Sequence, residues 1–485
     1  MNAPAVSQGL IVSLWNPKAP ADSRGRRWQP AGFLTTQGPS AGLFTYFSDY
    51  DGPAIDPVNM NYRQHLPGAV FRPHGGMGDI PGAFHDALPG HFGMQVLWRH
   101  FPELSRATPA ALIDWFGQRA HSGLLFERAG RATPERYISN LKDLDAVRGP
   151  AVALAGGATP ATGHTADNAN QTPIDGIRYL EVVREQAIRS QMQEMTRMLT
   201  LDGSRALSPV DEERLYSTTS AGGAQPKAFL KFEGKYWIAK FNRPGDTVNA
   251  ARVEHAMLEL ARASGIDAPF SRVVTLPDSG VDVLLVERYD RSATHRAHRV
   301  SALTLLGLPH SGAMASADYQ DLLALAKNLG GEDGQADRHE MLRRAIFQSG
   351  ASITDNHLRN FEWMVGPEGR WVPTPLFDLA PNPQSELATP LCGLRTQRQI
   401  LTTDLPAILA RKTGLPLPEI TGICADVAGR MVTHLETVIV RARMGVAEAQ
   451  TMHKCLPVAH LAALAAQWQK PAAQPKASAS PRPSG

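Results

Sequence analysis

Cysteine is scarce in this chain: 485 residues contain only Cys392, Cys424 and Cys455. The three lie far apart without CxxC spacing, which argues against a disulfide framework or a cysteine zinc site and favours a reducing cytoplasm. Long apolar runs are absent too, since none approaches 18 residues, and the amino terminus has no basic segment followed by an apolar core. We therefore expect neither membrane spanning nor export.

An excess of one charge is also missing. Lysine and arginine number 49 against 46 aspartates and glutamates, so charge by itself does not indicate nucleic-acid binding, and any DNA contact is expected to be local or made through a partner. A hydrophobic content of 43% and a charged content of 20% are typical of a soluble globular protein. The length allows two to four domains of about 150 residues each.

Candidate chemistry is densest in residues 352–379. The segments FEWMV and RWVPT, separated by GPEG, predict a β-hairpin that holds Asp355, Asn360 and Asp378 near one another. Phosphoryl transfer needs a carboxylate to receive the hydroxyl proton, and an Asn and an Asp to hold Mg²⁺ against nucleotide phosphates. A cap or an Asx-turn is the alternative for an isolated Asp.

A second informative stretch covers residues 217–240. The turn AGGAQPK precedes AFLKF and YWIAK, which predict a hairpin around EGK. Gly222 and Gly223 let the backbone approach phosphate oxygens, and Lys240 on the same hairpin can reach the α- and β-phosphates. The GxxxxGK[ST] pattern of a P-loop is absent, and an ordinary turn is the alternative for a lone GG pair.

The next segments predict a helix and two strands. Residues 247–264 form the helix, on which Glu254 either pairs with Lys240 or lies on a solvated surface, since spacing does not fix its orientation. The strands SRVVTL and VDVLLVE lead into ERYDR, where we expect a hinge whose backbone binds adenine and whose Asp290 meets the ribose.

Further elements frame these stretches. Alternation in residues 9–36 predicts a hairpin, followed by a strand at 42–48. Residues 174–199 predict a long amphipathic helix. Later helices are expected at 318–329, 338–349, 405–412, 418–443 and 446–469.

Seven segments in order carry a family resemblance: FHDALPG, SAGGAQPK, the AK of WIAKF, RVEHAMLELA, VERYDR, TDNHLRNF and FDLAP. With them the chain resembles HipA-like serine/threonine kinases, the toxin components of bacterial toxin–antitoxin pairs. The resemblance implies an α+β, two-lobed protein-kinase-like fold. The implied divisions are an N-terminal HipA-type subdomain 1–148, a flexible linker 149–173, an N-lobe 174–298 with Gly-rich loop and hinge, a helical C-lobe 299–469 and a disordered tail 470–485.

The resemblance also implies roles. Asp355 is similar to the catalytic base, Asn360 and Asp378 to the Mg²⁺ ligands, and Lys240 to the lysine that binds ATP phosphates. His357 has either a direct role or a structural one in the catalytic loop. The implied ATP-binding residues are Gly222, Gly223, Ala224, Gln225, Lys227, Lys240, Glu287, Arg288, Tyr289, Asp290, His357 and Asn360.

The resemblance also implies a serine able to undergo autophosphorylation at Ser220, with Thr218 or Ser217 as alternatives. A phosphate there adds roughly −1.5 to −2 charges and would compete with ATP phosphates, so the modification should be inhibitory. Asn356 and Arg359 depart from the family, in which Gly and Lys are common. Neither departure removes a catalytic group.

The sequence thus predicts a cytoplasmic kinase that uses ATP and Mg²⁺ to phosphorylate Ser or Thr of a protein, and the resemblance implies an aminoacyl-tRNA synthetase among the targets. A HipB-like helix-turn-helix antitoxin is the implied partner, with DNA reached only through it and no membrane involved. Two alternatives stay open: a small-molecule kinase, and a catalytically weak nucleotide-binding subunit that acts by docking to the antitoxin.

Overall fold

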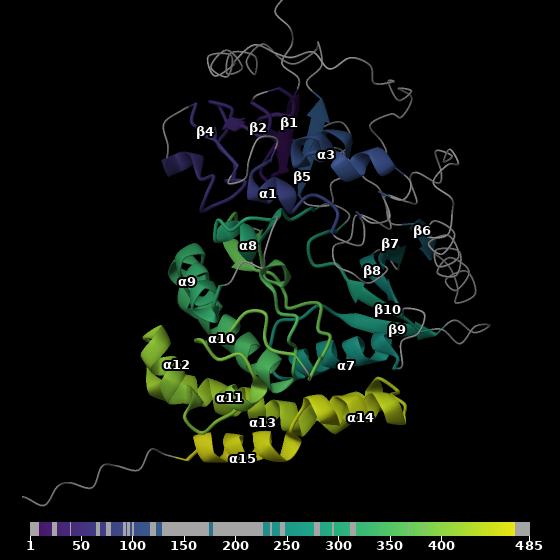
Figure 1. Ribbon diagram of the computed structural model, residues 1–485, viewed down its shortest axis with the longest axis vertical. Helices are drawn as coiled ribbons and strands as arrows, with labels where there is room; N and C mark the ends of the chain where they lie inside the picture. Colours follow the sequence, from purple (N-terminus) through teal and green to yellow (C-terminus); the bar gives the residue numbers. More distant parts are fainter. Residues whose placement is uncertain are drawn as a thin grey trace, which may run out of the picture.

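The protein is described in a computed structural model (Figure 1). The described residues are 9–21, 27–38, 40–64, 68–73, 79–90, 94, 98, 101–116, 123–128, 174–177, 227–232, 235–242, 248–275, 282–292, 295–310, 317–366, 368–383 and 385–470. Within them, no helix is both long and apolar enough to cross a membrane.

The amino-terminal part contains a five-stranded antiparallel sheet of order β4-β3-β2-β1-β5. Its strands are β1 (Gly9–Trp15), β2 (Trp28–Thr35), β3 (Phe44–Tyr46), β4 (Val70–Phe71) and β5 (Leu124–Arg128). The short helix α1 (Gly82–His85) and α3 (Pro109–Phe116) accompany it. The hairpin and the third strand predicted from alternation are confirmed, because the buried strand residues form the core of this unit.

A second five-stranded sheet has the order β6-β7-β8-β10-β9. Its strands are β6 (Ile174–Ile177), β7 (Lys227–Phe232), β8 (Lys235–Phe241), β9 (Ser271–Thr275) and β10 (Asp282–Glu287). The hairpin of β7 and β8 and the strands before the hinge are confirmed. Helix α7 (Ala250–Ala263) packs against β9 and β10.

The helix predicted to begin at residue 174 is wrong at its start. Residues 174–177 form β6, which pairs in parallel with β7 through Ile174 opposite Leu230. Pairing with an available sheet edge overrides helical periodicity in a segment that holds a glycine and two β-branched isoleucines. The rest of that predicted helix, residues 178–199, lies outside the described residues, as does the predicted linker.

A three-stranded sheet carries the predicted FEWMV and RWVPT hairpin. It consists of β11 (Arg299–Ser301), β12 (Glu362–Val365) and β13 (Trp371–Pro373), all antiparallel. The hairpin is confirmed. It joins the segments that hold Asn360 and Asp378.

The carboxy-terminal half is mainly helical: α8 (Ala302–Leu305), α9 (Tyr319–Leu329), α10 (Gly334–Gly350), α11 (Gln397–Ile400), α12 (Leu405–Thr413), α13 (Leu417–Arg441), α14 (Val446–Cys455) and α15 (Val458–Trp468). Helix α13 contacts α7, α10, α12 and α15, so α7 lies between the second sheet and α13 (Figure 1). The single helix predicted for 446–469 is wrong. It divides at Leu456, whose backbone is extended before Pro457, as residues that precede proline prefer.

The mixed helix and sheet content confirms the α+β part of the predicted fold class. The division into two lobes and the domain boundaries stay predictions.

Candidate active site

Lys240 is the centre of the candidate site. It lies on β8, the middle strand of the second sheet, where it is paired with Lys227 on β7 and Leu284 on β10. Its side chain is 6% exposed, and its Nζ donates to Glu254 Oε1 at 2.5 Å and to Asp378 Oδ1 at 2.6 Å. Burial alone would lower the pKa of Lys240, but these two carboxylates outweigh it and raise that pKa. The ammonium is therefore charged.

Glu254 reaches this lysine from α7. Its neighbours Ala251, Val253 and Met257 are buried, so this helix surface faces the core rather than solvent. The Glu254 side chain is 7% exposed. Of the two alternatives left open by the sequence, the ion pair with Lys240 is the one that forms.

Asp378 faces two ammonium groups. Besides the bond to Lys240, its Oδ1 lies 4.0 Å from Lys227 Nζ. Lys227 and Lys240 hold the pKa of Asp378 well below its usual range, outweighing burial, which raises it. The backbone of Asp378 has a φ of +59°, a left-handed conformation that is uncommon outside glycine and that occurs at functional sites.

The candidate catalytic loop presents Asp355 to solvent: its side chain is 75% exposed. The loop is held from within, because Asn360 Nδ2 donates to the Asp355 carbonyl at 2.8 Å. It is also held from outside. Asn356 Nδ2 donates to the Thr389 carbonyl at 3.1 Å, and the Thr389 amide donates back to Asn356 Oδ1 at 3.0 Å. An exposed carboxylate on a fixed backbone suits a group that receives a proton from an incoming substrate.

His357 lies near this carboxylate, with Nε2 4.0 Å from Asp355 Oδ1 and a side chain that is 41% exposed. Its Nδ1 is buried and has no hydrogen-bond partner among the described residues. That nitrogen thus gives no support to the structural alternative, in which His357 ties the loop together.

The predicted hinge follows β10. The amides of Glu287 and Arg288 donate to the carbonyls of Phe270 and Tyr236, each at 2.8 Å, so neither can donate to a base unless these bonds break. The Glu287 carboxylate accepts from Lys235 Nζ at 2.8 Å. The Tyr289 hydroxyl donates to Glu362 at 3.2 Å.

Asp290 is buried rather than turned toward a ligand. Arg288 donates to it at 2.6 and 2.9 Å, and Arg299 Nε lies 3.1 Å away. Burial would raise the pKa of Asp290, but the arginines outweigh it and lower that pKa. Contact with a ribose stays a prediction, which these bonds disfavour.

The Gly-rich loop and the expected autophosphorylation segment lie outside the described residues. This applies to Ser217, Thr218, Ser220, Gly222, Gly223, Ala224 and Gln225. Of this predicted set, Lys227 is described, and it is buried beside Asp378.

The two predicted metal ligands have the chemistry that Mg²⁺ prefers. Asp378 offers a carboxylate and Asn360 an amide oxygen, both hard ligands, and Mg²⁺ is commonly held by one or two side chains together with substrate phosphates. Among the described residues, no group of three or more His, Cys, Asp or Glu is placed to hold a metal ion. A magnesium ion here would therefore depend on the nucleotide for its other ligands.

Thr389 is the contact that sequence reasoning missed. It lies in the irregular loop after Asp378. Its backbone amide and carbonyl bond to Asn356, and such backbone contacts cannot be predicted from the residue type. The one signal was Asn356, a side chain with both a donor and an acceptor at a position where relatives commonly have Gly.

Comparisons with known proteins include one family-model match and two structural likenesses. Residues 219–435 match the family model of the HipA-like C-terminal domain. The chain is similar to HipA of Shewanella oneidensis MR-1, solved in a toxin–antitoxin complex with HipB and operator DNA, at 18% identity, a TM-score of 0.59, and coverage of 94% of this chain and 96% of that one. The proinflammatory kinase CtkA of Helicobacter pylori matches at 13% identity and a TM-score of 0.34 over 50% of this chain and 94% of that one, a likeness too distant to carry an argument.

The fold has mixed helix and sheet content, and in it a lysine on a central strand is paired with a glutamate on the adjacent helix. The chain carries a HipA-like C-terminal domain over residues 219–435, and over most of its length its fold is similar to that of the Shewanella HipA. The resemblance found in its motifs is confirmed.

Proposed function

We propose that this protein is an ATP-dependent serine/threonine kinase of the HipA-like toxin type. The observation that supports it most is the convergence on Lys240: Glu254 from α7 and Asp378 from the segment after β13 both contact its ammonium. Protein kinases require a lysine–glutamate pair and a metal-binding aspartate at the same place. A non-catalytic nucleotide-binding subunit would not need the exposed carboxylate of Asp355.

The proposed reaction moves the γ-phosphoryl group to a hydroxyl oxygen of a protein Ser or Thr. A bond forms between this oxygen and phosphorus, the bond from phosphorus to the β-γ bridging oxygen breaks, and ADP leaves. Asp355 receives the hydroxyl proton, while Lys240 neutralises phosphate charge and Glu254 holds its ammonium in place. Asn360 and Asp378 would hold Mg²⁺, which when bound neutralises charge on the phosphates.

A HipB-like helix-turn-helix antitoxin is the proposed partner, since the Shewanella HipA was solved with HipB and operator DNA. DNA would then be reached through the partner, which agrees with the small charge excess of this chain. An aminoacyl-tRNA synthetase as target and inhibitory autophosphorylation near Ser220 are part of the same proposal and rest on the family resemblance.

The test compares wild type with Asp355→Gln. Phosphoproteomes of cells expressing each protein would show Ser or Thr sites that depend on Asp355, and purified protein with Mg-ATP would show whether Ser217 to Ser220 become phosphorylated. Glu436→Gln is a matched control, because its side chain is 71% exposed, close to the 75% of Asp355, but lies on α13. Equal growth arrest by Asp355→Gln and wild type, without new phosphosites, would instead favour the docking alternative.

A further inference from the structure

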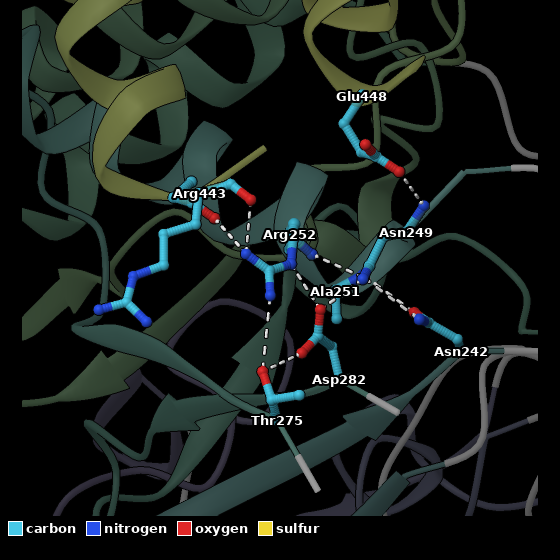
Figure 2. Close-up of polar contacts among 9 residues, drawn as sticks. Asn242, Asn249, Ala251, Arg252, Thr275, Asp282, Arg443 and Glu448 are labelled. Atoms are coloured by element: carbon cyan, nitrogen blue, oxygen red, sulfur yellow. Dashed lines mark hydrogen bonds and ion pairs between the residues drawn. The ribbon is translucent and has the colours of Figure 1, made fainter. Parts of the chain in front are cut away.

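The amino-terminal end of α7 is hydrogen-bonded to the residues that follow α13 and to α14. Figure 2 shows Arg252 at the centre of this junction. Its Nη1 donates to the carbonyls of Ala442 and Arg443, at 3.1 and 2.6 Å, just beyond the end of α13. A guanidinium there satisfies carbonyls that the helix leaves unpaired and lies at the negative end of the helix dipole.

The same guanidinium is held on the sheet side. Its Nε donates to Asp282 Oδ2 at 2.5 Å, at the start of β10. The Asp282 side chain is 4% exposed, and it also accepts from Thr275 Oγ1 and, at 2.5 Å, from Asn249 Nδ2. Arg252 therefore connects three elements, α7, the start of β10 and the end of α13, through one planar group.

Further bonds fix the first turn of α7 against its neighbours (Figure 2). The Asn249 amide donates to Glu448 Oε1 on α14 at 3.0 Å, and the Ala251 amide donates to Asn242 Oδ1 after β8 at 3.0 Å. The Arg252 amide donates to the Asn249 side chain at 3.2 Å. These amides are ones that a helix start leaves unpaired, so side chains from outside the helix set where α7 begins.

Glu254 lies two residues after Arg252 on the same rigid helix. A shift of the first turn of α7 therefore moves the Glu254 carboxylate relative to Lys240, which is fixed on a central strand. We propose that Arg252 is a positioning residue: by binding the end of α13 and Asp282 together, it holds α7 where Glu254 meets Lys240. This inference rests on the proposed kinase function for its effect on turnover, but the effect on the Lys240–Glu254 pair does not depend on it.

Two readouts test the proposal on the full-length protein. The first is the rate at which an amine-acylating reagent labels Lys240, followed by mass spectrometry, because burial and the ion pair protect this amine. The second is ADP release from Mg-ATP. In Arg252→Gln we expect Lys240 labelling to rise and turnover to fall, each by roughly tenfold, within the range of couplings between contacting groups. Arg252→Lys keeps the positive charge but not the planar set of guanidinium donors, so its labelling and turnover should lie between those of wild type and Arg252→Gln.

A double-mutant cycle separates positioning from simple stabilisation. If Arg252 acts through Glu254, adding Arg252→Gln to Glu254→Gln should leave labelling and turnover unchanged, while the thermal midpoint still falls. The matched control is Arg262→Gln on the same helix, which removes a guanidinium bonded to a backbone carbonyl, that of Pro269 at 2.7 Å, but not to α13. It should leave both readouts at wild-type values.

The outcomes are distinguishable. Wild-type labelling of Lys240 in a folded Arg252→Gln protein would overturn the inference, as would an equal loss of turnover in the Glu254→Gln background. If Arg252→Gln does not fold, Arg252→Lys and Glu448→Gln carry the test, and unchanged labelling in both would overturn it. A wild type that releases no ADP would contradict the proposed function, whereas Lys240 labelling would still decide the inference.

Discussion

The ammonium of Lys240 lies 2.6 Å from the carboxylate of Asp378. The residue expected to bind ATP phosphates is thus bonded to the residue expected to bind magnesium. Both groups are charged, since their mutual attraction raises the pKa of the lysine and lowers that of the aspartate. In the proposed function, the phosphates of a metal–nucleotide complex would compete with Asp378 for Lys240.

The first prediction concerns Asp378→Asn. Without metal, the variant should bind ATP several-fold more tightly than wild type, because the carboxylate that competes for Lys240 is gone. With Mg²⁺, turnover should fall on the order of 100-fold or more, because a charged ligand of the ion is lost. Calorimetry with ATP in EDTA and ADP release with Mg²⁺ measure the two effects.

Asp426→Asn is the control for this prediction, since Asp426 is also ion-paired, with Arg343 at 2.6 Å and Arg430 at 2.7 Å, but lies on α13. It should change neither quantity. A metal-free ATP affinity that falls in Asp378→Asn would show that Asp378 does not compete with phosphate.

The second prediction concerns stability. Lys240→Met leaves the buried Glu254 carboxylate without its cation, while Asp378 keeps Lys227 at 4.0 Å, and loss of one partner of a buried pair costs roughly 3–5 kcal/mol. Lys240→Met combined with Glu254→Met also removes the unpaired charge of Glu254, so it should be more stable than the single variant. Urea denaturation at neutral pH measures both. A single variant as stable as wild type would contradict the structure.

The parts of the site visible in the sequence are those carried by local patterns. Lys240 and Glu254 lie 14 residues apart on a strand and the next helix, so alternation and helical periodicity were enough to predict their elements. Spacing could not fix the rotation of α7, which depends on the buried surface that the helix presents to the sheet and α13. The pair was therefore one of two alternatives before the structure decided between them.

Contacts to distant backbone carbonyls could not be predicted from local sequence patterns. Arg252 reaches Ala442 across 190 residues, and Asn356 reaches Thr389 across 33. Every residue has a backbone carbonyl, so the residue types at positions 389 and 442 do not indicate that their carbonyls accept these hydrogen bonds. The left-handed backbone conformation of Asp378 could not be predicted either, because that conformation is usually inferred from a glycine and this residue is an aspartate.

The third prediction concerns the two hydrogen bonds between Asn356 and Thr389 that hold the candidate catalytic loop. Asn356→Ala removes both hydrogen bonds to Thr389 and leaves the buried amide and carbonyl of Thr389 without these partners, which costs about 1–3 kcal/mol for each unsatisfied group. Turnover should fall more than ATP affinity, because Asp355 loses its fixed position while Lys240 does not. Thermal melts, ADP release and ATP titration measure the three effects. If affinity and turnover fell in parallel, Asn356 would have a general role in folding and not one in placing Asp355.

The last prediction concerns acid sensitivity at His298, which directly precedes β11 and is bonded to the segment that follows β3. Its Nε2 donates to the Ile55 carbonyl at 2.7 Å, and the residue is 1% exposed. Burial lowers the pKa of His298 from 6.5 to about 4, against the smaller opposing effect of the hydrogen bond. Between these values the unfolded chain binds a proton that the folded protein does not, so stability decreases as the pH falls from 6.5 through 4.

A shift of this size corresponds to about 3 kcal/mol for one buried group. His298→Gln keeps an N–H donor for Ile55 and has no titrating group, so its free energy of unfolding should fall less than that of wild type between pH 6.5 and 4. Other histidines titrate in both proteins, and the difference therefore isolates His298. His453→Gln, whose side chain is 45% exposed, should behave like wild type. Urea denaturation across this pH range measures the effect, and parallel curves for wild type and His298→Gln would show that His298 is not the acid-sensitive group.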